Sequence, residues 1–393
     1  HSFKHQNQVG SVTLHKIMKG IIKQSFSINL RLMGAFGLYP PETSGFLYKV
    51  QAYFLYSAFT LPIPILGTLY FILDEEINAA LDGNAFLIVE MACQITKLFT
   101  FIRNGDKIRK CIHYFEKPFF ANYTDKQKKI IDRCSRICRR NSIIFLVSII
   151  GGNIFWATRP FFSKEQKFPV DVWFPYNPMA GTKIFYSVYL FLVMGNGYSS
   201  MACAAVDPLI GGLACLAAGQ LEVLKDNLQH LNEYAGKESE KLSRTGFCGK
   251  IKKSRIIYSK IHDCIDHHNA ILKFVNNYEE CFSSAVFSQF LGSTLVICFC
   301  CLQLSKVQPM SYNFFSMISF LSVFLAQIYI YCYYGTVLFE ESNTLTNAIY
   351  MGRWYEYDVK SRKALVILME RSKKPILITA GTILDVSVGT FTM

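Results

Sequence analysis

The sequence predicts an all-α membrane protein in which seven transmembrane helices are joined to long helical extensions outside the bilayer. Three observations support this fold class: several apolar stretches have membrane length, only 18% of residues are charged, and the chain carries 33 Phe and 22 Tyr. Soluble domains average about a quarter charged residues. The mean hydropathy of +0.23 is modest, as expected when membrane spans alternate with polar helices.

Seven stretches are apolar over roughly the 20 residues that a bilayer crossing requires. The second carries Glu90 and Lys97, so we expect it to face protein or a cavity rather than lipid. The fourth is too long to be only a span, and Pro62 and Pro64 should kink or break the first. The seven stretches are Phe46–Leu73, Ala85–Ile102, Ile143–Phe162, Ile184–Leu221, Cys281–Leu304, Tyr312–Phe339 and Pro375–Met393.

The distribution of Lys and Arg predicts the orientation of these spans. Residues 1–49 hold six basic side chains against one acidic, and residues 103–140 hold twelve against four. The loop between the first two spans holds no basic residue and four acids, whereas residues 340–374 hold seven basic residues. Because cytoplasmic loops are enriched in Lys and Arg, the N-terminus should lie inside and the C-terminus outside. A G-protein-coupled receptor has the opposite orientation.

Two features could be interpreted differently. The sequon Asn122-Tyr123-Thr124 lies in a loop placed in the cytoplasm, so we expect it to be unmodified; glycosylation there would invert the orientation. The net charge of +13 is compatible with nucleic-acid binding, but the charge lies between apolar stretches, which favours membrane topology as its explanation.

Polar extensions with helical periodicity follow the fourth span, over about Glu222–Glu280. A glycine-containing break at Arg244–Gly249 divides them into two helices that should leave the membrane into the cytoplasm. Each helix has one apolar stripe, which must be buried against a neighbour. That neighbour is either another subunit or the paired helix of the same chain. The stripes are Leu221, Leu224, Leu228 and Leu231 in one helix, and Ile257, Ile261, Cys264, His268, Ile271 and Val275 in the other.

A basic amphipathic segment over 17–33 should form a helix at the cytoplasmic membrane interface. The chain begins with His1, so we expect its N-terminus to be cut. The predicted organisation is an N-terminal amphipathic segment (1–45), four spans with the ligand pocket (46–221), intracellular extensions forming an anchor (222–280), two further spans (281–339), an intracellular linker (340–374) and a last span (375–393).

The last third of the chain carries a series of short motifs. Tyr331-Cys332-Tyr333-Tyr334-Gly335 and Glu341-Ser342 precede Ala348-Ile349-Tyr350 and Trp354; then come Thr379-Ala380-Gly381 and Thr390-Phe391. In this order and spacing they resemble the C-terminal signature of insect odorant receptors. The resemblance covers the whole chain in span layout and the last third in motifs. The Thr-Tyr and Gln-Phe ending of the related gustatory receptors is absent.

This resemblance implies a subunit of an odorant-gated non-selective cation channel in the plasma membrane of olfactory neuron dendrites. Family members form tetramers around one central pore, and most are tuning subunits that require the co-receptor Orco. The short loop between the fourth and fifth spans resembles a tuning subunit, so the expected partners are Orco, a small volatile ligand, membrane lipid and permeating cations. In the family, the intracellular helices of neighbouring subunits contact each other. The family's gate lies beyond the Thr-Phe pair, so we expect the gate residues to lie beyond Met393.

The resemblance also suggests where the ligand should bind and where the ions should pass. In the family, odorants bind an apolar pocket in the outer half of each subunit, between the second, third, fourth and sixth spans. The candidate ligand-binding residues are Met91, Ala92, Ile95, Gly152, Trp156, Asn196, Ser200, Phe315, Ser319 and Phe320. The candidate pore-lining residues are Gly381, Asp385, Val388 and Thr392. Helix packing is the alternative role for each ligand-binding candidate except Trp156, which could instead belong to an interfacial belt. Asp385 could instead pair with a neighbouring helix. Asp207, inside the fourth span, should be structural or coupled to the gate.

Enzyme chemistry has no support in the sequence. Metalloprotease, P-loop and serine-hydrolase motifs do not occur, and no cofactor or metal site is expected. Two other classes of membrane protein are alternatives. A receptor acting through G proteins should carry Asp-Arg-Tyr and Asn-Pro-x-x-Tyr motifs, and a transporter often has internal repeats; neither feature is found.

Overall fold

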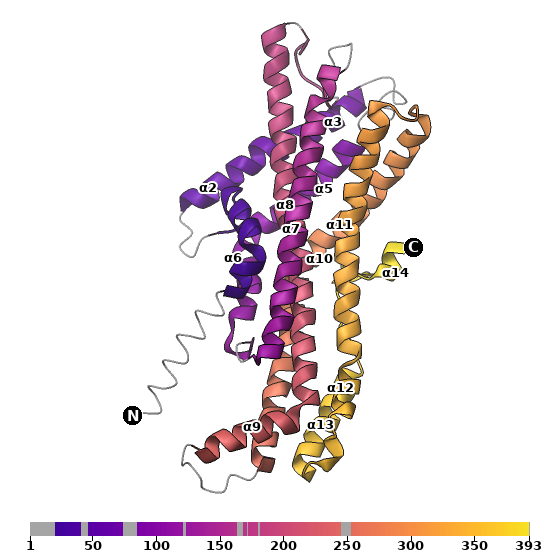
Figure 1. Cartoon of the computed structure of the whole chain (residues 1–393). Coiled ribbons are helices and arrows are strands. Elements are labelled where there is room, and N and C mark those ends of the chain that lie inside the picture. Colours follow the sequence, from indigo (N-terminus) through magenta and orange to yellow (C-terminus); the bar gives the residue numbers. More distant parts are fainter. Residues whose placement is uncertain are drawn as a thin grey trace.

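The computed structural model describes residues 20–40, 46–73, 85–120, 123–162, 168–170, 172–179, 181–244 and 253–392, and this part of the chain is almost entirely helical. Long helices run side by side along one axis, and smaller helices gather at the lower end in Figure 1. After a helix over 20–35, the elements are α2 (Phe46–Leu55), η1 (Tyr56–Thr60), α3 (Pro62–Leu73), α5 (Ala85–Arg103), α6 (Gly105–Ile112), η2 (His113–Glu116), η3 (Pro118–Phe120), α7 (Asp125–Phe162), α8 (Thr182–Gln229), α9 (Leu231–Arg244), α10 (Lys253–Lys306), α11 (Tyr312–Asn343), α12 (Leu345–Met351), η4 (Trp354–Glu356), α13 (Val359–Ser372), β1 (Thr379–Ala380), β2 (Leu384–Asp385) and α14 (Val388–Thr392).

Five helical stretches in the described residues are long and apolar enough to cross a membrane: Phe46–Leu73, Asp125–Thr158, Thr182–Gln229, Lys253–Lys306 and Phe314–Met351. They coincide with five of the seven predicted stretches. The second predicted span is also a helix, α5, but its Glu90, Gln94 and Lys97 side chains are polar. All three are buried, as expected for polar groups in a helix that faces protein rather than lipid.

The first span is interrupted where its two prolines predict a break. A π-helical turn over Tyr56–Thr60 separates α2 from α3, and the Leu61 amide donates to the carbonyl of Tyr56, five residues back. Pro62 and Pro64 follow at once. Since a proline has no N–H to donate and its ring displaces the preceding turn, the regular helix cannot continue through this point.

Helix α8 is the centre of the bundle, and α7, α10 and α11 pack around it (Figure 1). In its most apolar stretch 94% of residues are buried, against 11% in the corresponding stretch of α7. Small residues allow this close packing. A Cβ at Gly211 would lie 2.7 Å from Ile330, and one at Gly219 would lie 2.7 Å from the Sγ of Cys134. The small residues of the fourth span therefore make room for its neighbours.

The predicted extensions exist as continuations of the long helices. Helix α10 has 54 residues, a length of roughly 81 Å, which is far more than a bilayer core of about 30 Å. Both predicted apolar stripes are buried in the core. Helix α9 ends at Arg244, and the rest of the predicted break lies outside the described residues, as do Asn122, the acidic loop 74–84 and residues 17–19. A role of this region in joining subunits stays a prediction.

The prediction of one helix over Pro375–Met393 is wrong. After α13 the chain is extended, forms the two-stranded hairpin β1–β2, and becomes helical again only at Val388. Pro375 cannot donate to a preceding carbonyl, and Gly381 and Thr382 both have φ of +62°, which reverses the chain. Several backbone amides here donate to side chains of α10 and α11, and the Val386 amide donates to the carbonyl of Ile378 within the hairpin.

Candidate ligand pocket and pore segment

Two small clusters of buried apolar side chains lie in the half of the bundle away from α9, α12 and α13, and we call them the distal clusters. The first comprises Phe86, Leu87, Ile88, Val170, Val296, Cys300, Met317 and Phe324. The second comprises Ile63, Met91, Val188 and Leu192. They draw on α3, α5, α8, α10 and α11 and on the chain between α7 and α8. Val172 packs against both clusters, so they adjoin one another.

Three of the predicted ligand-binding residues reach the distal clusters. Met91 belongs to the second cluster and is 3% exposed. Phe320 packs against the first, with its ring centroid 4.9 Å from that of Phe86 and 4.6 Å from that of Phe324. Trp156 packs against the first cluster as well. These residues come from α5, α7 and α11, so the tertiary fold brings three distant helices to one apolar region.

Trp156 also carries an unsatisfied donor. Its indole Nε1 is buried and has no hydrogen-bond partner among the described residues. Leaving a buried N–H group unpaired costs about 1–3 kcal/mol, so native structures rarely do it without a reason. An acceptor atom on a bound molecule would remove that cost.

Asn196 and Ser200 already have partners within the protein. The Asn196 side-chain amide donates to Oδ1 of Asn153 at 3.0 Å, and Asn153 donates to the Ser200 hydroxyl at 2.8 Å. Ser200 in turn donates to the carbonyl of Asn196 at 2.7 Å. This closed set of hydrogen bonds joins α7 to α8. The two residues thus occupy a helix contact beside the distal clusters.

The remaining candidates lie apart from the distal clusters. Ala92, Phe315 and Ser319 are exposed, and the Phe315 side chain is 50% accessible. Ile95 packs against the main core, and a Cβ at Gly152 would meet nothing within 4 Å. The sequence could not settle these orientations, because a span that touches protein on one side and lipid on the other is apolar on both.

Sequence reasoning missed the chain between α7 and α8. Apolar side chains alternate there at Phe168, Val170, Val172 and Phe174, and all four pack on the distal clusters. The Trp173 amide donates to the carbonyl of Leu66 at 3.1 Å, which attaches this segment to α3. The period of two was visible in the sequence and indicates extended chain with one buried face.

A cluster of buried polar side chains lies below the distal clusters, and we call it the polar cluster. Lys97 on α5 forms an ion pair with Asp207 on α8; their side chains are 1% and 3% exposed. Lys97 also donates to Oε1 of Gln289 on α10 at 3.0 Å. On α11, Gln327 donates to one carboxylate oxygen of Asp207, and Tyr331 donates to the other at 2.6 Å. Asp207, predicted to be structural or coupled to the gate, therefore joins four helices.

The hairpin and α14 are held against α10 and α11. The Oε1 atom of Glu279 accepts from both the amide and the hydroxyl of Thr379, each at 2.8 Å. Ser283 accepts from the Gly381 amide at 2.8 Å, and Thr336 accepts from the Val388 amide at 2.8 Å. Gly335 is essential to this contact, since a Cβ there would lie 2.0 Å from the carbonyl oxygen of Val386.

The four predicted pore-lining residues all lie in this segment. Gly381 is part of the hairpin turn and faces the Phe287 ring, and Val388 begins α14. Asp385 and Thr392 are exposed. In Figure 1, α14 stands clear of the bundle beside α11.

One face of α11 links these three regions. Phe320 and Phe324 contact the distal cluster, Tyr331 binds Asp207, and Gly335 contacts the segment before α14. Positions three or four apart share a helix face, so the series 320, 324, 327, 331 and 335 forms one continuous strip. The distal clusters, the polar cluster and the segment before α14 therefore all contact the same face of one helix.

Comparison with known proteins places the chain in a family. The family model described as "7tm Odorant receptor" matches residues 77–393. Odorant receptor Or1 of Anopheles gambiae is 22% identical over 94% of this chain and 91% of its own length. The odorant receptor coreceptor of the same mosquito is 20% identical over 92% of this chain and 93% of its own length. Olfactory receptor OR5 of Machilis hrabei, solved free and in complex with eugenol, superposes with TM-scores of 0.79 and 0.78 at 16% identity, over 97% of this chain and 95% of OR5. The members of this family are receptors and not enzymes, and the chain belongs to the seven-transmembrane odorant receptors of insects.

Proposed function

We propose that the chain is the odorant-binding subunit of a heterotetrameric, odorant-gated, non-selective cation channel formed with the co-receptor Orco. The observation that carries the proposal is the strip on α11, which connects an apolar region with an unpaired donor to the segment of the candidate pore residues. The membership of the odorant receptor family supports it, and so does the likeness to OR5, a receptor that was solved with eugenol bound.

The ligand would be a small volatile molecule with an apolar body and one oxygen acceptor. The distal clusters supply the apolar wall, with Met91 and Phe320 among its residues, and Trp156 supplies the donor. Burial of the apolar body provides most of the affinity, at about 25 cal/mol per Å². One hydrogen bond to a buried N–H adds the preference for oxygenated compounds.

Gating follows from differential affinity. A ligand that binds better when α11 is displaced raises the population of that arrangement, and it can shift the equilibrium only by this difference. The polar cluster makes α11 move as a unit with α5, α8 and α10, because Asp207 holds side chains from all of them directly or through Lys97. The hairpin and α14 would follow through Thr336 and Gly335.

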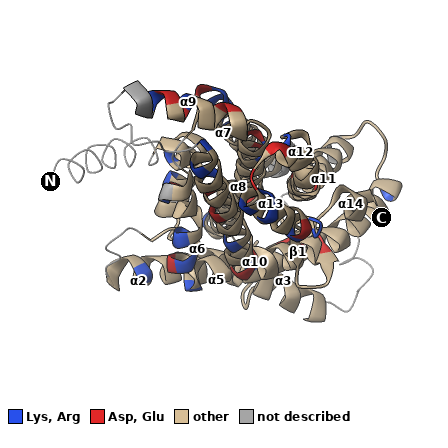
Figure 2. Cartoon of the chain, turned by 90° about the horizontal axis from the view of Figure 1, so that it is seen from below, with Lys and Arg blue, Asp and Glu red and all other residues tan. Residues whose placement is uncertain are grey.

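The pore would be lined by Gly381, Asp385, Val388 and Thr392 of several subunits. An exposed carboxylate such as that of Asp385 attracts cations, as rings of acidic side chains do in cation channels. The N-terminus would lie in the cytoplasm and the receptor in the dendritic plasma membrane of olfactory neurons. The lower end of the bundle, seen in Figure 2, carries Lys and Arg on α6, α7 and α13, which supports this orientation.

The decisive experiment is to record currents from cells that express the full-length receptor with and without Orco, under an odorant panel and with G-protein signalling blocked. We expect a fast cation current that requires Orco and persists under the block. Responses that disappear under the block would refute the channel. An N-terminal epitope tag should be stained only after permeabilisation, and staining of intact cells would refute the orientation.

A further inference from the structure

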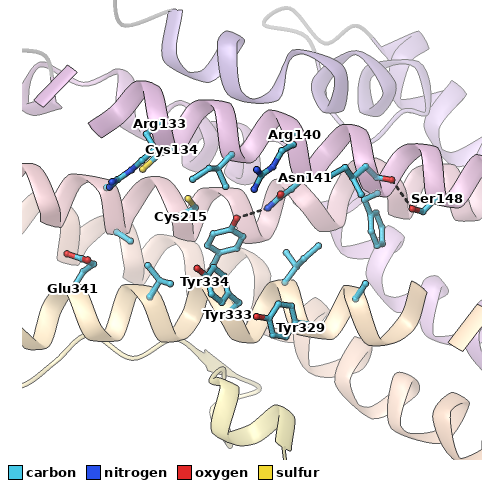
Figure 3. A pocket seen from close by; sticks show the side chains of 18 of the residues that line it. Arg133, Cys134, Arg140, Asn141, Ser148, Cys215, Tyr329, Tyr333, Tyr334 and Glu341 are labelled. Carbon is cyan, nitrogen blue, oxygen red and sulfur yellow. Dashed lines mark hydrogen bonds between the residues drawn. The ribbon is translucent and has the colours of Figure 1, made fainter. Parts of the chain in front are cut away.

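A groove of about 750 Å³ runs between α7, α8 and α11, away from the distal clusters (Figure 3). Apolar side chains line most of it, including Ile137 and Ile144 of α7 and Ile330 and Val337 of α11. The groove follows α11 from Ser322 to Glu341, a span of roughly 28 Å at 1.5 Å per residue. The stretch from Ser322 to Tyr334 is roughly 18 Å long, which is about one leaflet of a bilayer core, and its walls are apolar enough for an acyl chain.

The open side of the groove exposes side chains of two candidate membrane spans. Ile144 is 57% exposed, and Tyr329 and Tyr333 are 44% and 43% exposed. All three belong to helices long and apolar enough to cross a membrane. The Tyr334 hydroxyl is instead satisfied inside, where it accepts from the Asn141 amide at 2.6 Å.

Among the described residues, one cation that lines the groove has no charged or hydrogen-bonding partner. Arg133 pairs with Glu222, and Glu341 pairs with Lys225, so both acids of the groove are neutralised. Arg140 also lines the groove, and Figure 3 shows it beside Asn141 on α7. Arg140 is exposed and forms no hydrogen bond or ion pair with any described residue.

The surroundings of Arg140 are strongly basic. The same helix face and its neighbours carry further cations over one stretch of α7: Lys126, Lys128, Lys129, Arg133, Arg136 and Arg139. Arg136 donates to a backbone carbonyl, and Lys126 pairs with Asp226. Clusters of basic residues beside a membrane span attract anionic lipid headgroups. Charge complementarity therefore points to an acidic rather than a zwitterionic headgroup beside Arg140.

We propose that the groove binds a phospholipid with an acidic headgroup, whose phosphate lies at Arg140 and whose acyl chain lies along Ile144 and Ile330. The leaflet of this lipid rests on the orientation proposed above, whereas the binding itself does not. The bound lipid contacts α11, the helix that also holds the segment before α14. The groove is thus a second ligand site on the receptor, separate from the distal clusters.

The test uses the full-length receptor, purified and reconstituted in vesicles that contain photoactivatable phosphatidylserine or photoactivatable phosphatidylcholine. Crosslinked peptides are identified by mass spectrometry. We expect phosphatidylserine to label peptides of α7 and α11 that line the groove about fivefold more than phosphatidylcholine, a factor typical of one basic side chain at an anionic surface. Arg140→Gln should abolish this preference.

Arg139→Gln is the matched control, because Arg139 is the adjacent arginine, is also exposed and does not line the groove. It should keep the preference for phosphatidylserine. Equal labelling by both lipids, or equal loss in the two variants, would overturn the proposal, and so would crosslinks from the groove to a second copy of the chain. Because labelling does not depend on current, a failure of the lipid site is distinguishable from a failure of the channel function.

Discussion

Removing one charge from the polar cluster should destabilise the receptor far more than removing both. Asp207 has three described partners, namely Lys97, Gln327 and Tyr331, and Lys97 has Gln289 in addition. Lys97→Met leaves the carboxylate of Asp207 buried without a counter-charge. Asp207→Asn leaves the buried ammonium of Lys97 without the partner of its ion pair. Loss of one partner of a buried pair costs about 3–5 kcal/mol, and each single variant should lose this much.

The double variant K97M/D207N should lose only about 1 kcal/mol. With both charges gone, Gln327 and Tyr331 can still bind the side chain at position 207. Gln289 loses the ammonium donor but keeps its own donation to Ser293 at 2.9 Å. One net hydrogen bond is therefore missing, which is worth about 1 kcal/mol. The non-additivity, not the size of either single loss, is the signature of the buried pair.

The free energy of unfolding is measured for the purified receptor by denaturant titration in detergent. Arg133 and Glu222 provide the control pair, since their side chains are 55% and 32% exposed. Their variants R133Q and E222Q should each cost less than about 1 kcal/mol. If the losses of Lys97→Met and Asp207→Asn simply added in the double variant, the two groups would not act as a pair in the folded receptor, and the reasoning would be refuted.

Three further predictions concern the pocket and the pore segment. Trp156→Phe should raise the half-maximal concentration of oxygenated odorants about tenfold and leave that of hydrocarbons of similar size unchanged, since only the Nε1 donor is lost. Equal shifts for both classes of odorant would contradict a hydrogen bond from Trp156 to the ligand. Gly335→Ala should greatly reduce the current per receptor at the cell surface, because its Cβ would overlap Val386. Gly197→Ala is the control and should leave the current unchanged, since a Cβ there meets nothing within 4 Å. Equal currents in the two variants would count against coupling between α11 and the pore segment. Glu279→Ala should speed amide hydrogen exchange at Thr379 and its neighbours in the hairpin, and unchanged exchange would mean that Glu279 does not hold this segment.

Much of the architecture was readable because membrane spans and amphipathic helices leave strong local signals. The five long apolar stretches, the break before Pro62 and the buried stripes on α8 and α10 were all predicted, and each is confirmed. The family was also recognisable from short motifs in order. The prediction of the last span was wrong for a local reason as well. The apolar residues after Pro375 have the composition of a membrane helix, but Gly381 and Thr382 reverse the direction of the chain.

What the sequence by itself determined is which segments enter the membrane and which stripe of each extension is buried, because burial in lipid or in a helix pair depends on composition and period. Only the tertiary structure decided which buried groups meet. Lys97 and Asp207 are 110 positions apart, and Trp156 reaches a cluster whose buried members come from α5, α10, α11 and the chain between α7 and α8. Side chains of a span are apolar on the lipid side and on the protein side alike, so pattern alone cannot orient them; the partner across the contact does.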